Sequence, residues 1–201
     1  MKKINKIIIG TRNDGKFKEI CDLLPKNITK ISPRDLNLLS PDETGNTFEE
    51  NSKIKAEYFT KKANLIAISD DSGLMIDPLS GAPGIYSSRW AGPTNDFNVA
   101  IEKIYNELKK IKFKWSKRKE IVARFISCLT LHWPNGKFIS STGIVEGRIS
   151  EIKKGTNGFG YDPIFIPSGY EKTFGELNPQ EKIKIDHRSK AFLKISNFFI
   201  N

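Results

Sequence analysis

The sequence has little cysteine. Only two cysteines occur among its 201 residues, Cys21 and Cys128, and they lie far apart without the spacing of metal ligands. Both fall inside apolar segments, which indicates buried free thiols rather than a disulfide framework or a cysteine-ligated metal. A chain of this length buries enough surface to fold without such staples, as one large domain or as two small lobes that share a core.

The sequence also lacks a long hydrophobic run. Lys2 and Lys3 resemble the start of a signal peptide, but the apolar run that follows covers only residues 7–9 and ends at Gly10. This run is too short for export or for a membrane span. No repeat, low-complexity stretch or Pro/Gly-rich linker divides the chain. We therefore expect a cytoplasmic protein that forms one domain over residues 1–201 and has no membrane partner.

Positive charge is in excess, with a net charge of +10. Half of it comes from residues 101–120, where eight Lys or Arg residues stand against three glutamates. Interleaved aromatic residues leave open a nucleic-acid-binding patch. Lysine outnumbers arginine, however, and phosphate and base contacts favour arginine, so a solvated helix end and loop is the preferred interpretation. Basic charge also attracts nucleotides, and we expect no specific nucleic-acid partner.

Apolar periodicity predicts strands that alternate with helices, followed by a hairpin. Trp133-Pro134-Asn135-Gly136 is a hairpin signal. Asn178 and Pro179 are suited to the start of a C-terminal helix with one apolar stripe. The expected strands are residues 6–10, 28–31, 65–69, 121–131, 137–145 and 164–166, and the expected helices are residues 16–24, 47–62, 97–108 and 179–199. This order predicts an α/β fold with a mixed sheet.

Residues 10–16, Gly-Thr-Arg-Asn-Asp-Gly-Lys, lie between an expected strand and an expected helix. Backbone N–H groups, the Thr11 hydroxyl, the Asn13 amide and the Lys16 ammonium are suited to an anion at a helix N-terminus. The spacing matches the first part of a P-loop, but Phe17 stands where that motif needs a hydroxyl for Mg²⁺. A P-loop kinase or GTPase is therefore disfavoured, and an ordinary strand-to-helix turn is the alternative.

Asp70-Asp71-Ser72-Gly73 follows the expected end of a strand. Adjacent carboxylates repel each other unless a cation lies near, and Mg²⁺ typically bridges carboxylates and a substrate phosphate. The alternative is ordinary turn chemistry. A nucleophilic serine is not expected, because Ser72 has no histidine near it in sequence.

Residues 155–163, Gly-Thr-Asn-Gly-Phe-Gly-Tyr-Asp-Pro, form a glycine-rich loop. Its glycines permit close approach of a ligand to the backbone, Phe159 and Tyr161 offer stacking faces, and Asp162 supplies a carboxylate. A surface loop over packed aromatics is the alternative. On the last expected helix, Lys182, His187 and Arg188 make a donor-rich cluster, or else an ordinary basic helix face.

The order of these segments closely resembles the inosine triphosphate pyrophosphatase family, the non-canonical purine NTP pyrophosphatases. The resemblance runs from about residue 7 to residue 193. The motifs that carry it are Thr11-x-Asn13-x-Gly15-Lys16, Glu43-Thr44-Gly45, Thr47-Phe48-x-Glu50-Asn51-x-x-x-Lys55-Ala56, Asp70-Asp71-Ser72-Gly73-Leu74, Gly81-Ala-Pro-Gly-Ile-Tyr-Ser-x-Arg89, Ala123-Arg124-Phe125, Gly155 to Pro163, Lys172-Thr173-Phe174-x-Glu176-Leu177 and His187-Arg188.

The resemblance implies a two-lobed α/β protein with a long mixed sheet flanked by helices, an active site in the cleft between the lobes, and a homodimer. It implies Mg²⁺-dependent hydrolysis of ITP, dITP and XTP to the monophosphate and pyrophosphate. Asp71 would be the general base, and Glu43 and Asp71 would hold Mg²⁺ with Asp70 close by. The implied phosphate contacts are Thr11, Arg12, Asn13, Asp14, Gly15, Lys16, Lys55 and Arg89, and the implied nucleotide contacts are Ser72, Phe159, Gly160, Tyr161, Asp162, Lys182, His187 and Arg188.

Two residues depart from the family's pattern. Arg12 stands where glycine is common, and Asp186 stands where serine usually precedes His-Arg. Two other functions stay open: a related pyrophosphatase acting on pyrimidine triphosphates, and a nucleic-acid-binding module that uses residues 101–120. The carboxylates of Glu43, Asp70 and Asp71 argue against the second, because carboxylates repel phosphates unless a metal intervenes.

Overall fold

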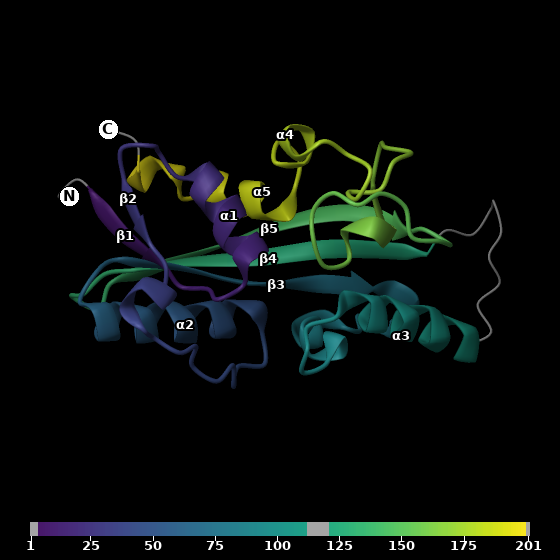
Figure 1. The fold of residues 1–201 in the computed structure, drawn as a ribbon, viewed down its shortest axis with the longest axis horizontal. Helices are drawn as coiled ribbons and strands as arrows, with labels where there is room; N and C mark the ends of the chain where they lie inside the picture. Colours follow the sequence, from purple (N-terminus) through teal and green to yellow (C-terminus); the bar gives the residue numbers. More distant parts are fainter. Residues whose placement is uncertain (1–3, 112–120, 200–201) are drawn as a thin grey trace. The chain divides into compact units, whose positions relative to one another are not determined.

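A computed structural model describes residues 4–111 and 121–199, so part of the basic segment at 101–120 lies outside the described residues. Figure 1 shows the arrangement of the strands and helices. The strands are β1 (Lys6–Ile9), β2 (Thr29–Ile31), β3 (Ala67–Ile76), β4 (Val122–His132), β5 (Phe138–Ile149) and β6 (Phe165–Pro167); the helices are α1 (Asp14–Leu23), α2 (Phe48–Ala63), α3 (Phe97–Lys110), α4 (Pro179–Lys182) and α5 (His187–Leu193).

The strands form one mixed sheet. Their order is β2-β1-β3-β4-β5-β6. β1 pairs in parallel with β2 and with β3, whereas β5 and β6 are antiparallel. The tight turn between β4 and β5 is closed by a hydrogen bond from Trp133 N to the Lys137 carbonyl at 2.8 Å. The predicted α/β fold and the predicted hairpin are confirmed.

Contacts divide the chain into two compact units. The first comprises Met1–Asp71, Ser127–Gly143 and His187–Asn201, and the second comprises Ser72–Ile126 and Ile144–Asp186. β3, β4 and β5 each continue from one unit into the other. Each unit is therefore assembled from segments that are distant in sequence.

In the first unit, β1 is buried on both faces, as its run of three isoleucines predicts. Ile7 and Ile9 pack with residues of α1 and α5, such as Ile20 and Phe192. Ile8 points the other way and packs against Phe59 of α2. Accordingly α1 and α5 lie on one face of this part of the sheet and α2 on the other (Figure 1). This arrangement brings the first residues of α1 and of α5 close to β3.

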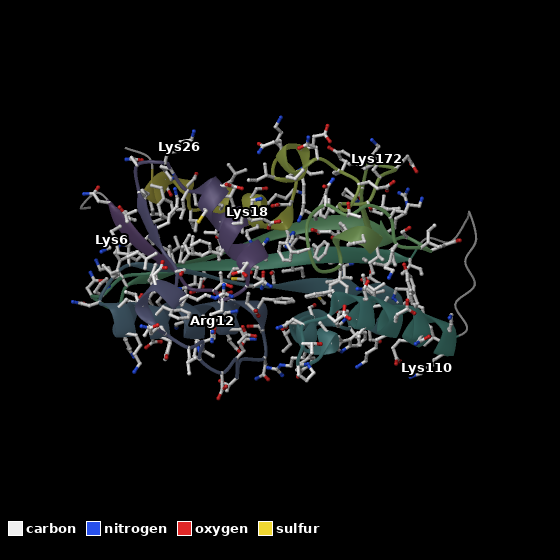
Figure 2. All side chains as sticks on the ribbon, viewed as in Figure 1. Lys6, Arg12, Lys18, Lys26, Lys110 and Lys172 are labelled. Carbon is white, nitrogen blue, oxygen red and sulfur yellow. The ribbon has the colours of Figure 1, made fainter. Side chains whose placement is uncertain are left out.

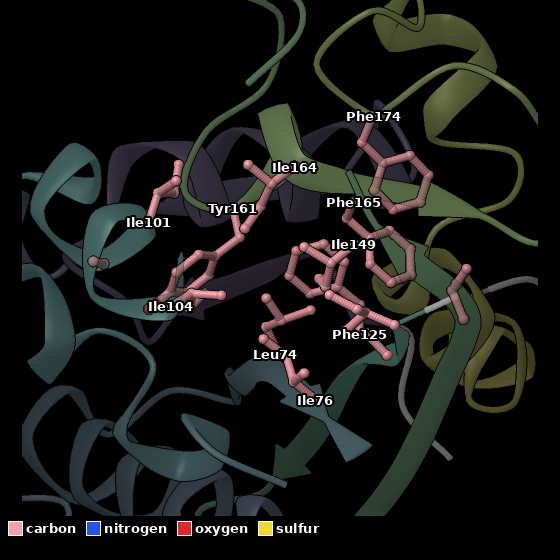
Figure 3. Close-up of a cluster of buried hydrophobic side chains, with 14 of the residues drawn as sticks. Leu74, Ile76, Ile101, Ile104, Phe125, Ile149, Tyr161, Ile164, Phe165 and Phe174 are labelled. Carbon is pink, nitrogen blue, oxygen red and sulfur yellow. The ribbon is translucent and has the colours of Figure 1, made fainter. Parts of the chain in front are cut away.

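The core of the second unit is rich in aromatic residues (Figure 3). Phe125 packs edge-on against Phe165, with ring centroids 4.7 Å apart, and Phe174 lies 5.3 Å from Phe165. Ile101 and Ile104 of α3 complete the cluster from the helix side. Asp96 caps α3 by accepting a hydrogen bond from Asn98 N, as its sequence position predicts.

Two predicted elements are wrong. β3 does not end at residue 69 but continues to Ile76, so Asp70 and Asp71 lie inside the strand rather than in a turn after it. Cations from other elements compensate both carboxylates there, and this compensation is invisible in the local sequence. The single C-terminal helix is instead α4, a break, and α5. Residues 186–189 are all buried, which a one-sided helical stripe does not allow.

The surface carries the excess of basic side chains. Lys18, Lys26, Lys110 and Lys172, labelled in Figure 2, are all exposed. Within residues 4–111 and 121–199, no helix is both long enough and apolar enough to cross a membrane.

Candidate active site

The loop between β1 and α1 is shaped by local hydrogen bonds. Asn13 caps α1, because its Oδ1 accepts a hydrogen bond from Lys16 N at 3.0 Å, and Thr11 Oγ1 accepts one from Asn13 N at 3.2 Å. Gly10 is required before this loop, since a Cβ there would clash with Ser69 and Phe59. Arg12, where a glycine was expected, is exposed and does not have a positive φ. The loop therefore accepts arginine without backbone strain.

Arg34 holds the same loop from outside, a contact that the sequence did not predict. Its guanidinium donates to Asp14 Oδ1 at 2.7 Å and to the Arg12 carbonyl at 3.1 Å. The side chains of Arg34 and Asp14 are 55% and 80% exposed, so this ion pair contributes little stability. Asp14 is thus a surface partner of Arg34 at the first residue of α1.

Asp70 lies at the centre of a buried charge cluster in the first unit. Its Oδ2 forms an ion pair with Lys16 Nζ at 2.9 Å and accepts a hydrogen bond from Arg188 at 3.3 Å, and its Oδ1 accepts one from the Ser127 hydroxyl at 2.5 Å. Burial alone raises the pKa of Asp70, but Arg188, Lys16 and Ser127 together hold this pKa well below the usual range. Asp70 is therefore an anchor that is ionised at neutral pH and whose two oxygens are both engaged by the protein.

Lys55 joins the other two carboxylates of the first unit. Its ammonium donates to Glu43 Oε1 at 2.5 Å and to Asp71 Oδ1 at 3.0 Å. Burial alone lowers the pKa of Lys55, but Asp71 and Glu43 outweigh it and raise this pKa. The loop carrying Glu43 is fixed by Asn51, whose Oδ1 accepts a hydrogen bond from Gly45 N at 2.8 Å. Lys55 thus stays charged and brings Glu43 and Asp71 to the same point.

Asp71 differs from its neighbour Asp70. Among the described residues, its buried Oδ2 has no hydrogen-bond partner. Burial raises the pKa of Asp71; the nearby Glu43 and Asp70 add to this, while Lys55 and Lys16 oppose it. Two adjacent carboxylates whose pKa values are displaced in opposite directions are typical of a site that divides anchoring from proton transfer.

A divalent cation fits Asp71 and Glu43. Both side chains supply hard carboxylate oxygens, and both are ion-paired with the ammonium of Lys55. The buried Oδ2 of Asp71 has no hydrogen-bond partner within the described residues. No group of three or more His, Cys, Asp or Glu residues suited to a metal occurs among residues 4–111 and 121–199. Mg²⁺ suits such an incomplete site, because it usually keeps several waters and binds one or two carboxylates together with substrate phosphates.

The glycine-rich loop of the second unit is organised around Asp162. Asp162 Oδ2 accepts hydrogen bonds from Phe159 N at 2.8 Å and from Lys182 Nζ at 2.7 Å. The Lys182 ammonium also lies 5.2 Å from the centre of the Phe159 ring. Gly158 has a φ of +73°, and a Cβ there would clash with Asp162. Three predicted nucleotide contacts, Phe159, Asp162 and Lys182, are therefore gathered in one place.

Other predicted contacts in the second unit are spread out. Tyr161 is buried, and its hydroxyl donates to the Ser87 carbonyl at 2.8 Å. Its ring packs 5.2 Å from that of Phe97. Arg89 is exposed and lies 5.0 Å from the centre of the Tyr86 ring. Ser72 and Gly160 are half-buried.

His187 and Arg188 begin α5 in the first unit, and both are buried. His187 is fixed by close packing, since a Cβ at Gly143 would clash with its carbonyl oxygen. Arg188 forms ion pairs with Asp70 and with Glu19 of α1. Glu19 and Ser127 were not predicted from the sequence as members of this cluster. Glu19 had one recognisable signal, its position one helical turn after Lys16.

The structure thus brings together Lys16, Glu43, Lys55, Asp70, Asp71 and Arg188 in the first unit. Thr11 and Asn13 shape the loop that presents Lys16. The remaining predicted contacts, among them Arg89, belong to the second unit. The predicted cleft between lobes stays a prediction.

Comparisons with known proteins agree with these features. A model of the Ham1 family matches residues 7–198. A dITP/XTP pyrophosphatase of Rhodopseudomonas palustris is 43% identical over 199 residues, covering 95% of this chain and 94% of the relative. One of Agrobacterium fabrum is 44% identical over 200 residues, covering 94% and 92%. The structure of a HAM1 protein from Coxiella burnetii matches with a TM-score of 0.83 and 36% identity, over 96% of each chain. The resemblance found in the motifs is confirmed.

Proposed function

This chain belongs to the Ham1 family, and from that premise we propose that it hydrolyses the non-canonical purine nucleoside triphosphates ITP, dITP and XTP to the monophosphate and pyrophosphate. The observation that carries the proposal is Asp71: a buried carboxylate with a raised pKa and an oxygen without a partner in the described chain, next to the Lys55–Glu43 pair. The reaction removes nucleotides that carry damaged purines from the pool.

Phosphate binding is assigned to the start of α1. The loop from Thr11 to Lys16 offers backbone N–H groups at a helix N-terminus, where an anion is favoured. Lys16 adds an ammonium that is anchored on Asp70. Lys55 and the exposed Arg89 are proposed as further phosphate contacts. Together these cations offset the charge of the triphosphate.

The proposed metal ligands are Glu43 and Asp71, and the proposed ion is Mg²⁺. When bound, Mg²⁺ neutralises charge on the phosphate oxygens and polarises the phosphorus for attack. Asp70 lies next to these ligands in sequence, but its oxygens are engaged by Lys16, Arg188 and Ser127. We therefore assign Asp70 the task of positioning this segment of β3 and Lys16.

Asp71 is the proposed general base. Its Oδ2, which has no hydrogen-bond partner within residues 4–111 and 121–199, accepts a proton from water as the water oxygen bonds to the α-phosphorus. The bond from the α-phosphorus to the bridging oxygen breaks, and pyrophosphate leaves. A carboxylate with a raised pKa is better suited to hold this proton than an ordinary surface aspartate. Lys55 keeps the acceptor oriented through Asp71 Oδ1.

Base selection is assigned to donors and aromatic faces. Inosine and xanthine carry an oxygen at C6 where adenine carries an amino group, so a donor favours them and disfavours ATP. His187 and Arg188 are the proposed donors to that oxygen. Ser72 and the loop containing Phe159, Gly160, Tyr161 and Asp162, with Lys182 beside it, are the proposed contacts to the rest of the nucleotide.

We further propose a homodimer in the cytoplasm. The family resemblance supports the dimer, and two cysteines that form no disulfide suit a reducing compartment. Light scattering of the purified protein tests the dimer: a mass of one chain at micromolar concentration would contradict it.

The substrate proposal is tested by pyrophosphate release from a panel of triphosphates. ITP, dITP, XTP, ATP, GTP, dUTP and dTTP are each assayed with Mg²⁺ and with EDTA. We expect rapid release only from the first three and only with Mg²⁺. Guanine also carries an oxygen at C6, so we assign the exclusion of GTP to its 2-position and to the loop of residues 155–162. Equal turnover of dUTP or dTTP would favour a pyrimidine-directed enzyme, and metal-independent release would remove Mg²⁺ from the account.

A further inference from the structure

Glu19 is a charged side chain that the proposed reaction does not yet use. It lies on α1, one turn after Lys16, and its side chain is only 16% exposed. It forms an ion pair with Arg188, whose side chain is 1% exposed, at the start of α5. α1 and α5 lie side by side on one face of the sheet (Figure 1). The pair is thus largely removed from water, unlike the surface pair of Asp14 and Arg34.

Arg188 links Glu19 to Asp70 in the candidate active site. One terminal nitrogen of the guanidinium binds Glu19, and the other binds Asp70 Oδ2 at 3.3 Å. The same Asp70 oxygen forms an ion pair with Lys16, whose Nζ lies 2.9 Å away. The ion pairs therefore form a row of alternating charges. The row runs from Glu19 in the middle of α1, through Arg188 and Asp70, to Lys16 in the first turn of α1.

This arrangement places two cations on one carboxylate oxygen. Arg188 and Lys16 both form ion pairs with Asp70 Oδ2. Glu19 pairs with the other terminal nitrogen of Arg188 and so limits how closely the guanidinium approaches Asp70. Without the charge on Glu19, the guanidinium would lose one of the two attractions that hold it, would move toward Asp70 and would displace Lys16. A guanidinium carries five N–H donors in a fixed fork, so it can bind two carboxylates and still serve a third acceptor.

We propose that Glu19 is a positioning residue for pyrophosphohydrolysis: through Arg188 it sets the position of Asp70 and hence of the Lys16 ammonium at the phosphate-binding loop. The inference rests on the function proposed above. Glu19 is assigned no contact with the substrate or with the reacting atoms. Its effect is on geometry, and a displacement of about 1 Å in a catalytic group can cost about a hundredfold in rate.

The test compares Glu19→Gln, Glu19→Asp and Asp22→Asn with the wild type, using ITP and saturating Mg²⁺. Asp22 is an exposed carboxylate on the same helix, so Asp22→Asn matches the change in net charge without touching Arg188. We expect kcat of Glu19→Gln to fall about tenfold to a hundredfold per folded molecule. Its KM should not rise, because losing a negative charge favours a polyanionic substrate. Glu19→Asp keeps the charge and should recover part of kcat, and Asp22→Asn should match the wild type.

A double-mutant cycle with Arg188→Met asks whether Glu19 acts through Arg188. If it does, adding Glu19→Gln to Arg188→Met lowers kcat/KM no further, whereas independent effects would multiply. A Glu19→Gln protein that loses thermal stability but keeps wild-type kcat would reduce Glu19 to a link between helices and overturn the inference. If Glu19→Gln does not fold, Glu19→Asp decides: wild-type kcat in that variant overturns the inference as well. An inactive wild type would overturn the proposed function too, whereas an active wild type with an unaffected variant overturns only the role of Glu19.

Discussion

Asp70 and Asp71 are adjacent, yet neutralising each of them should change stability in opposite ways. Asp70→Asn leaves the ammonium of Lys16 and the guanidinium of Arg188 without the carboxylate that both bind. Breaking a buried ion pair from one side costs about 3–5 kcal/mol. For a chain of this size each kcal/mol corresponds to about 2–4 °C, so Tm should fall by about 6–20 °C.

Asp71→Asn removes a carboxylate whose ionised form the fold disfavours. Burial raises the pKa of Asp71, so its ionisation weakens folding as the pH rises through that pKa. Lys55 keeps Glu43 as a partner in this variant. Tm at pH 7 should therefore be unchanged or higher than in the wild type. The same substitution is thus expected to lower Tm at Asp70 and to leave Tm unchanged or raise it at Asp71.

The pH dependence gives a second check. Because the pKa of Asp70 is lowered in the fold, its contribution to stability is complete above the unfolded pKa of about 3.9 and is lost as the pH falls toward the folded pKa. Wild type and Asp71→Asn should both lose this stability in acid, whereas Asp70→Asn should show a shallower acid limb.

Thermal unfolding is measured by circular dichroism from pH 3 to pH 8 in EDTA, so that no bound metal contributes. The wild type and both single variants are compared at the same protein concentration. Equal losses of Tm in Asp70→Asn and Asp71→Asn would refute the opposed electrostatics of the two carboxylates. So would an Asp70→Asn protein as stable as the wild type.

The remaining predictions concern the other charged groups. With Mg²⁺, kcat of Asp71→Asn for ITP should fall about 10²–10⁴-fold in steady-state assays, and near-normal kcat would remove Asp71 as the base. Lys16→Ala should lower both kcat/KM and Tm, because Lys16 is a partner of buried Asp70; unchanged Tm would contradict that pair. Lys182→Met removes the ammonium that pairs with buried Asp162 and should lower the free energy of unfolding by about 3–5 kcal/mol, measured with denaturant. Lys172→Met, at an exposed lysine, should change this free energy by almost nothing, and equal effects of the two substitutions would contradict the buried pair.

The order of strands and helices was predictable because periodicity and capping residues are local. Thr47, Asp96 and Asn178 each cap a helix as their positions indicate, and Asn13 caps α1 as well. The extension of β3 through Asp70 and Asp71 was not predictable in this way. Its charge compensation comes from Lys16, Lys55 and Arg188, which are distant in sequence.

The grouping of several charged residues was predictable from the motifs, whereas their individual contacts were not. The motifs gathered Lys16, Lys55, Asp70 and Asp71, and the structure brings them into one unit. The residue types and their spacing do not distinguish Asp70 from Asp71, and only the family resemblance assigned the base to Asp71. The physical difference lies in the three-dimensional contacts, which place Lys16 and Arg188 on Asp70 and leave an oxygen of Asp71 without a partner in the described chain. A lysine at the start of a helix is usually exposed, yet the Lys16 side chain is only 17% exposed and forms an ion pair with Asp70.

An internal competition tests the central claim most directly. Equimolar ITP and ATP are incubated with the protein and Mg²⁺ in one tube, and all nucleotides and phosphates are separated and quantified as the reaction proceeds. The account predicts that ITP is consumed first, with one IMP and one pyrophosphate formed for each ITP lost, while ATP persists. Formation of IDP and inorganic phosphate, or loss of ATP as fast as ITP, would contradict it.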